Sequence, residues 1–244
     1  MVAAYLLARA FERQGLGRDS AHTLVIWAAI WGFVGAKLYY LLEQLPTITM
    51  HDLGGTGFTW YGGLIGGLVA AVVVVRRHQL PLGLVAGAVA VPLTVAYGIG
   101  RLGCLVSGDG TYGKPTSLPW GMVFRHGVVA TDVPVHPAPL YEALAAVVIA
   151  VVLWAVGKYC SPPAIFGAYL ALSGISRFLV EFVRINDPVL LGLTQPQLWA
   201  LASQAAGVVL IVRTRPPSNL REANVMVASA NVTTTPRSAA RPSR

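Results

Sequence analysis

Long apolar stretches separated by short polar connectors dominate the sequence. A membrane-spanning helix needs about 20 mostly apolar residues. Six stretches approach that requirement, the last of them with several polar residues: 23–42, 59–75, 82–102, 140–157, 164–183 and 195–212. We expect the apolar residues Met1–Phe11 to be the end of a further membrane helix whose first half is missing. The pattern predicts an all-α fold, a polytopic integral membrane helix bundle of about six full transmembrane helices plus a truncated first one.

Composition and charge support a membrane protein. The chain is 55% hydrophobic and only 11% charged, whereas soluble domains carry about 25% charged residues. The net charge of +8 gathers in alternate connectors and in the C-terminal segment, so no nucleic-acid partner is expected. The positive-inside rule places those connectors in the cytoplasm and the loop 103–139 outside. The basic positions are Arg9, Arg13, Arg18, Arg76, Arg77, Lys158, Arg213, Arg215 and Arg221.

Two segments differ in composition. Residues 1–213 are predicted to form one membrane-embedded domain, and residues 214–244, rich in Ser, Thr, Pro, Ala and Arg, a disordered basic cytoplasmic tail. The arginines of this tail either contact anionic lipid or are simply solvated. Cys104 and Cys160 fall near opposite faces of the membrane, so we expect no disulfide between them, and no CxxC motif or His/Cys cluster indicates a metal.

A charged stripe lies within the fifth full stretch. Arg177, Glu181 and Arg184 follow the spacing i, i+4, i+7 and share one helical face. Charged side chains inside a membrane are costly and must face the bundle or a wet cavity. One interpretation is a neutralised ion pair that locks helices together. The other is an anion site, because two arginines share one glutamate and leave positive charge in surplus.

Two glycine-rich stretches bring further polar residues to the same depth. Arg101 ends its helix toward the outside and either snorkels to the interface or binds a ligand. Gly62 and Gly63 begin two small-xxx-small pairs, which are typical of close helix packing, and Tyr61 would suit an aromatic belt. Arg177 lies about 13 residues into its helix, or about 20 Å from the cytoplasmic side. These groups would therefore meet near the outer headgroups, where arginine is suited to bind a lipid phosphate.

Six motifs follow one another along most of the chain. They are Gly35–Tyr40 (GAKLYY), Tyr61–Gly67 (YGGLIGG), Gly100–Gly113 (GRLGCLVSGDGTYG), His136–Ala143 (HPAPLYEA), Arg177–Arg184 (RFLVEFVR) and Gln195–Gln197 (QPQ). The series resembles the bacterial prolipoprotein diacylglyceryl transferases. The resemblance implies transfer of diacylglycerol from phosphatidylglycerol to the lipobox cysteine of a prolipoprotein, with release of glycerol phosphate and without a cofactor. It implies a multi-pass inner-membrane protein with its site toward the outer leaflet and with lipid and prolipoprotein as partners.

The resemblance also implies roles for individual residues. Arg101 would bind the lipid phosphate, and Arg177 would stabilise the substrate or leaving group. The other implied catalytic residues are Tyr61, Asp109 and Glu181. The implied substrate-binding residues are Arg101, Gly62, Gly63, Cys104, Gly113, His136, Tyr141 and Arg184.

Departures from the family pattern leave alternatives open. Tyr61 stands where the family has a histidine, Cys104 where it has an asparagine, and Ser173 where it has a tyrosine. The general base is then either Tyr61 or His136. Cys104 is either a transient acceptor or a small buried hydrophobic residue. Glu142 either pairs with an arginine or shapes the cavity.

Two other functions compete with the transferase. A divergent paralogue would bind phospholipid or transfer lipid to another acceptor, without acting on prolipoproteins. A small-solute transporter would use the arginine cavity and would require two inverted repeats with broken helices. The sequence contains no such internal repeat.

Overall fold

A computed structural model describes residues 1–45, 54–55 and 57–214 of the chain. Its seven α-helices in these residues are α1 (Val2–Arg13), α2 (Arg18–Glu43), α3 (Trp60–Arg77), α4 (Leu82–Ser107), α5 (Ala138–Val156), α6 (Pro162–Val180) and α7 (Gln195–Arg213). Three short elements, η1 (Glu181–Val183), β1 (Pro188–Leu190) and β2 (Leu193–Thr194), connect α6 to α7. The predicted tail lies outside the described residues, apart from Thr214.

Five of the described helical segments are long and apolar enough to cross a membrane: α2, α3, α4, α5 and α6 with its extension to Val183. The predicted all-α multi-pass bundle is therefore confirmed. Helix α7 spans 19 residues but is not among the five. Its first turn carries Gln195 and Gln197, and Ser203 and Gln204 follow. It packs along α6, where an added Cβ on Gly207 would lie 2.5 Å from the carbonyl oxygen of Gly167.

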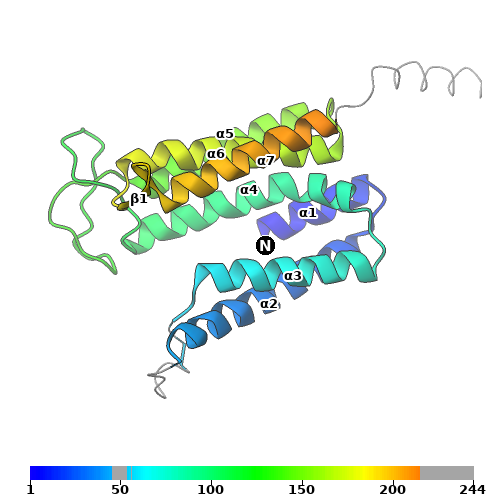
Figure 1. Cartoon of the computed structure of the whole chain (residues 1–244), viewed down its shortest axis with the longest axis horizontal. Coiled ribbons are helices and arrows are strands. Elements are labelled where there is room, and N and C mark those ends of the chain that lie inside the picture. Colours follow the sequence, from blue (N-terminus) through cyan, green and yellow to red (C-terminus); the bar gives the residue numbers. More distant parts are fainter. Residues whose placement is uncertain (46–53, 56, 215–244) are drawn as a thin grey trace, which may run out of the picture.

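The helices form two groups that join at one end. Helices α2 and α3 pack against each other, and α4, α5, α6 and α7 form the second group. A buried apolar cluster joins them through Phe11 of α1, Leu24 of α2, Val74 of α3 and Val85 of α4. From this junction the α2–α3 pair diverges from the other helices toward the opposite end of the molecule (Figure 1).

The two ends of the bundle differ in their connectors. The turns that follow α1, α3 and α5 and the end of α7 lie together (Figure 1). In or beside these turns lie Arg13, Arg18, Arg76, Arg77, Lys158 and Arg213. The long α4–α5 loop and the β1–β2 hairpin lie at the other end (Figure 1). Isolated β-bridges fold this loop back on itself, at Pro115–Val135 and Met122–Val135. A third bridge, Gly113–Arg184, fastens the loop to the end of α6, and this contact positions the candidate site.

Candidate active site

A buried carboxylate on α5 draws together arginines from two other parts of the chain. The side chain of Glu142 is 1% exposed. Its Oε2 lies 3.1 Å from Nε of Arg101 on α4, and its Oε1 lies 3.3 Å from Nη1 of Arg177 on α6. Nη1 of Arg184, just after η1, lies 3.6 Å from Oε2. Glu142 is therefore the common partner of three guanidinium groups.

A second buried carboxylate, Glu181, completes the cluster. Its Oε2 lies 3.0 Å from Nη2 of Arg177 and 3.8 Å from Nε of Arg184. Its Oε1 accepts hydrogen bonds from the Thr194 hydroxyl, at 2.9 Å, and from the Asn186 amide. The one-turn spacing read from the sequence thus places both arginines against the same glutamate, and each of them also reaches the Glu142 carboxylate on α5.

The cluster carries more positive than negative charge. Three arginines form ion pairs with two glutamates, so this ion-paired set carries one positive charge in excess. The carboxylates are buried, whereas the side chains of Arg101 and Arg177 are 22% and 25% exposed. Burial and the neighbouring Arg177 lower the pKa of Arg184, as expected where cations crowd together. The sequence left two alternatives open: ion pairs that lock helices together, and a surplus of positive charge. The structure contains both.

Several polar atoms of this cluster still lack hydrogen bonds. Glu142 Oε2, Glu181 Oε2 and Arg184 Nε are buried and make none with the described residues. Buried groups in this condition are rare and require an explanation. Ion-pair attraction compensates them in part, because each lies within 4 Å of an opposite charge.

The α4–α5 loop is held against this cluster through Gly113. A Cβ on this residue would lie 2.2 Å from the carbonyl oxygen of Val183, so only glycine allows the approach. The next backbone amide, that of Lys114, donates to the same oxygen at 2.8 Å. Arg184 Nη1 donates to the carbonyl oxygen of Thr111 at 3.1 Å. Gly113 therefore contributes to the site by docking the loop on Arg184.

Polar side chains continue from the loop to α5. Nδ1 of His136 lies 3.2 Å from the hydroxyl of Tyr141, which also accepts a hydrogen bond of 2.8 Å from Trp120 Nε1. Tyr141 directly precedes Glu142 in α5. His136 and Tyr141 are thus brought to the loop-facing end of the cluster.

Asp109 and Cys104 form a smaller polar group after Arg101. Asp109 Oδ1 accepts from the amide and hydroxyl of Thr111 at 3.1 and 2.6 Å. Burial alone would raise the pKa of Asp109, but hydrogen bonds from the Cys104 thiol and from Thr111, with the charge of Arg101, lower it. Asp109 is therefore an anion that accepts bonds from its neighbours. Cys104 and Cys160 are free cysteines.

Tyr61, Gly62 and Gly63 lie in a different part of the bundle. An added Cβ on Gly62 would lie 2.3 Å from the carbonyl oxygen of Gly35, so this glycine packs α3 closely against α2. The ring of Tyr61 meets that of Trp60 edge-on at 5.3 Å. Among the described residues, no hydrogen bond or ion pair joins these three to the arginine cluster.

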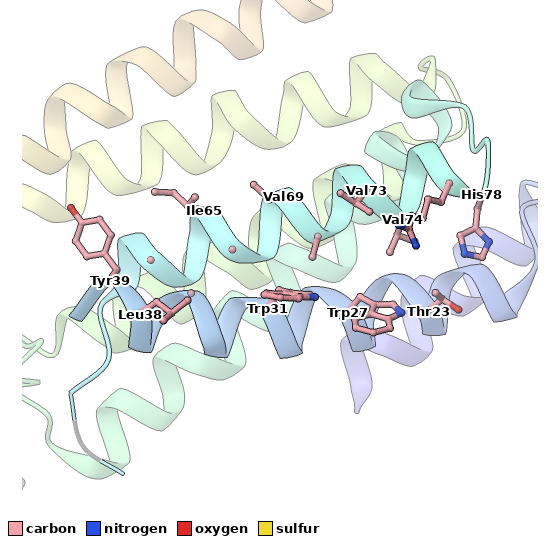
Figure 2. A pocket seen from close by; sticks show the side chains of 15 residues that line it. Thr23, Trp27, Trp31, Leu38, Tyr39, Ile65, Val69, Val73, Val74 and His78 are labelled. Atoms are coloured by element: carbon pink, nitrogen blue, oxygen red, sulfur yellow. The ribbon is translucent and has the colours of Figure 1, made fainter. Parts of the chain in front are cut away.

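A hollow runs along the same two helices. It has a volume of about 680 Å³ and a mostly apolar lining. Figure 2 shows Trp27 and Trp31 of α2 on one side and Ile65, Val69 and Val73 of α3 on the other. Its lining includes Gly62 but none of the three clustered arginines, so it is separate from the charged site.

Tyr97 and Thr194 are among the site residues that were not predicted from the sequence. Tyr97, one turn before Arg101 on α4, donates from its hydroxyl to Glu142 Oε1 at 2.9 Å. Thr194 caps α7 in a capping box with Gln197. Both had a readable signal: the i, i+4 spacing of Tyr97 and Arg101, and the T-x-x-Q pattern at a helix start.

Comparisons with known proteins point to one family. Residues 1–213 match the family described as prolipoprotein diacylglyceryl transferase. The phosphatidylglycerol–prolipoprotein diacylglyceryl transferase of Geobacter sulfurreducens is 36% identical over 199 residues, 76% of this chain and 74% of that protein. The enzyme of that name from Methylococcus capsulatus is 36% identical over 202 residues, 77% of this chain and 75% of that protein. The one from Pseudomonas putida is 33% identical over 208 residues, 80% of this chain and 77% of that protein.

The match covers every described helix, including the segments that bring Arg101, Glu142 and Arg177 together. The family match over residues 1–213 and the sequence identity of 33–36% to these three enzymes show which family the chain belongs to. It belongs to the prolipoprotein diacylglyceryl transferases.

Proposed function

We propose that this protein transfers the diacylglyceryl group of phosphatidylglycerol to the lipobox cysteine of a prolipoprotein and releases glycerol phosphate. Membership of the family supports the reaction. The structural observation that carries it is the convergence of Arg101, Arg177 and Arg184 on two buried carboxylates, with one positive charge in excess. A phosphodiester carries a single negative charge and would balance this excess.

The chemistry needs a stabilised leaving group. The thiolate sulfur of the lipobox cysteine attacks the glyceryl carbon, a carbon–sulfur bond forms, and the carbon–oxygen bond to phosphate breaks. The electron pair of that bond leaves with glycerol phosphate, which thereby gains negative charge. Fixed guanidinium groups in a site of low dielectric stabilise such charge as it develops. Arg101 and Arg177, the most exposed of the three, are the proposed phosphate ligands.

The thiol proton must leave before or during the attack, because the thiolate is the nucleophile. Of the two candidate bases, we assign this role to His136. It contacts Tyr141, which directly precedes Glu142, whereas Tyr61 lies on the α2–α3 side of the bundle. Glu142 and Glu181 are already engaged by arginines.

The arrangement of the connectors sets the orientation that we propose. The basic turns at one end of the bundle face the cytoplasm, by the positive-inside rule. The α4–α5 loop and the arginine cluster then lie toward the outer leaflet of the plasma membrane (Figure 1). Residues 1–213 act as the membrane domain, and the tail remains in the cytoplasm. The secreted prolipoprotein and the lipid headgroup would meet at this depth.

The experiment measures thioether formation on a lipobox peptide by purified protein in phosphatidylglycerol vesicles. Wild-type protein forms the lipidated peptide and releases glycerol phosphate in equal amounts. Arg101→Ala and Arg177→Ala abolish product while the protein still inserts. Arg77→Ala, an exposed arginine at the far end of α3, is the matched control and retains activity.

Two results would contradict the proposal. Product at the wild-type rate from both arginine variants would remove the mechanism. Inactive wild-type protein that also fails to complement a strain lacking its own prolipoprotein enzyme would favour the divergent paralogue instead. Transfer of lipid to a different acceptor in the same vesicles would identify that paralogue directly.

A further inference from the structure

Tyr97 touches two members of the charged cluster at once. Its hydroxyl donates to Glu142 Oε1 at 2.9 Å, and the guanidinium carbon of Arg101 lies 4.9 Å from the centre of its ring. Tyr97 and Arg101 are one turn apart on α4. The Tyr97 side chain therefore binds the Glu142 carboxylate through its hydroxyl. Its ring also contacts Arg101, which forms an ion pair with the same carboxylate.

The Tyr97 hydrogen bond defines the orientation of the carboxylate. It is shorter than the 3.3 Å bond from Arg177, the other donor to Glu142 Oε1. Glu142 Oε2 makes ion pairs but no hydrogen bond within the described residues. A carboxylate that pairs with several long side chains can rotate, and a further donor on one oxygen restricts this rotation.

Tyr97 achieves this without adding charge. A fourth cation at Glu142 Oε1 would increase the positive excess, and a carboxylate neighbour would cancel it. A neutral phenol satisfies the oxygen and preserves the single surplus charge that the phosphodiester needs. The ring face meanwhile attracts the Arg101 cation. Because the closest approach of Arg101 to Glu142 is through Nε, the end formed by Nη1 and Nη2 is not the one that this carboxylate occupies.

We propose that Tyr97 is a positioning residue of the transfer reaction, which orients Glu142 through its hydroxyl and holds the Arg101 guanidinium toward the lipid phosphate through its ring. The expected effect of Tyr97 on the transfer rate rests on the proposed function. Its expected effect on the affinity for an anionic headgroup is the binding part of the inference, and it can be measured without turnover.

Two substitutions separate the two contacts. Tyr97→Phe removes the hydroxyl and keeps the ring, and Tyr97→Leu removes both. A hydrogen bond to a charged group corresponds to about tenfold or more in an equilibrium or rate. Tyr97→Phe therefore lowers kcat at least about tenfold and leaves KM for phosphatidylglycerol within about twofold. Tyr97→Leu additionally raises KM several-fold. Tyr169→Phe on α6, a tyrosine packed against the apolar cluster of Ala90, Ile149 and Leu153, is the matched control and leaves both unchanged.

The binding part uses thermal stabilisation of the detergent-solubilised protein by phosphatidylglycerol, with phosphatidylethanolamine as the reference lipid. The wild type and Tyr97→Phe gain equal stabilisation from phosphatidylglycerol, and Tyr97→Leu loses most of it. Wild-type kcat in Tyr97→Phe, or full stabilisation of Tyr97→Leu, overturns the proposal. If phosphatidylglycerol stabilises the wild type and Tyr97→Leu loses this stabilisation, but the wild type forms no product, the transferase function is wrong while the binding role of Tyr97 stands.

Discussion

Arg101 and Arg177 approach different oxygens of one carboxylate, with Arg101 Nε 3.1 Å from Glu142 Oε2 and Arg177 Nη1 3.3 Å from Glu142 Oε1. The two arginines come from helices that are separated in the chain by the α4–α5 loop and all of α5. Glu142 is thus the structural link between the two proposed phosphate ligands, and it keeps like charges together that would otherwise repel.

Removal of the Glu142 charge should disrupt the cluster. A buried pair that loses one partner costs about 3–5 kcal/mol, because the remaining charge is left uncompensated. Glu142→Gln should therefore lower the midpoint of thermal unfolding in detergent and abolish transfer. Glu12→Gln, at an exposed ion pair with Arg18, is the control and should change the midpoint little. Wild-type stability and activity in Glu142→Gln would show that the arginines hold their positions without it.

Thr194 couples the start of α7 to the site. Its hydroxyl donates to Glu181 Oε1 at 2.9 Å and accepts from the backbone amide of Gln197 at 3.4 Å. Thr194→Val keeps the shape but loses both bonds, so we expect a loss of about 1–2 kcal/mol from the helix cap and a lower transfer rate. Thr194→Ser keeps the hydroxyl and should restore both stability and rate. Equal behaviour of the Val and Ser variants would contradict this assignment.

Adjacent glycines on α3 should differ sharply in their tolerance of a methyl group. The Cβ of Gly62→Ala would lie 2.3 Å from the Gly35 carbonyl oxygen, whereas the Cβ of Gly63→Ala would lie 3.4 Å from that of Gly32. We expect Gly62→Ala to destabilise the α2–α3 pair by about 1–3 kcal/mol and Gly63→Ala to be close to neutral. Thermal unfolding of both variants measures this. Selective loss of substrate affinity with unchanged stability would instead support the binding role first predicted for Gly62.

The orientation can be tested with cysteine labelling. Ser117 is exposed in the α4–α5 loop, and the native Cys160 is exposed at the opposite end of the bundle. In intact cells an impermeant thiol reagent should modify Ser117→Cys in a background that carries Cys104→Ala and Cys160→Ser. The native Cys160, in a Cys104→Ala background, should react only after lysis. The reverse pattern would invert the proposed topology.

Much of the fold follows from apolar length alone. The six predicted stretches coincide with α2 to α7 to within a few residues at most ends, because bilayer thickness dictates helix length. The spacing of Arg177, Glu181 and Arg184 correctly predicted that the three side chains meet. It did not predict that α6 ends at Val180, so that Arg184 follows η1 and lies outside the helix. The role of Glu142 was left open, since helical periodicity does not indicate which charge on another helix completes a cluster.

The remaining differences arise from tertiary packing. Tyr61 and Arg101 have comparable depths along their helices, yet α3 packs against α2 and carries Tyr61 away from the cluster. Depth in a membrane predicts height and not the direction that a side chain faces. Tyr97 was overlooked because a tyrosine in an apolar helix is unremarkable until its hydroxyl is seen to meet a buried carboxylate.

The polar start of α7 and its glycine contact with α6 have a consequence for biogenesis. A segment with two glutamines in its first turn partitions poorly into hydrocarbon by itself. Its close approach to α6 at Gly167 and Gly207 provides a partner already available during synthesis. We therefore expect α6 and α7 to leave the translocon as a helical hairpin. A bulky residue at position 207 would then leave the nascent C-terminal segment without its partner helix before the arginine cluster had assembled.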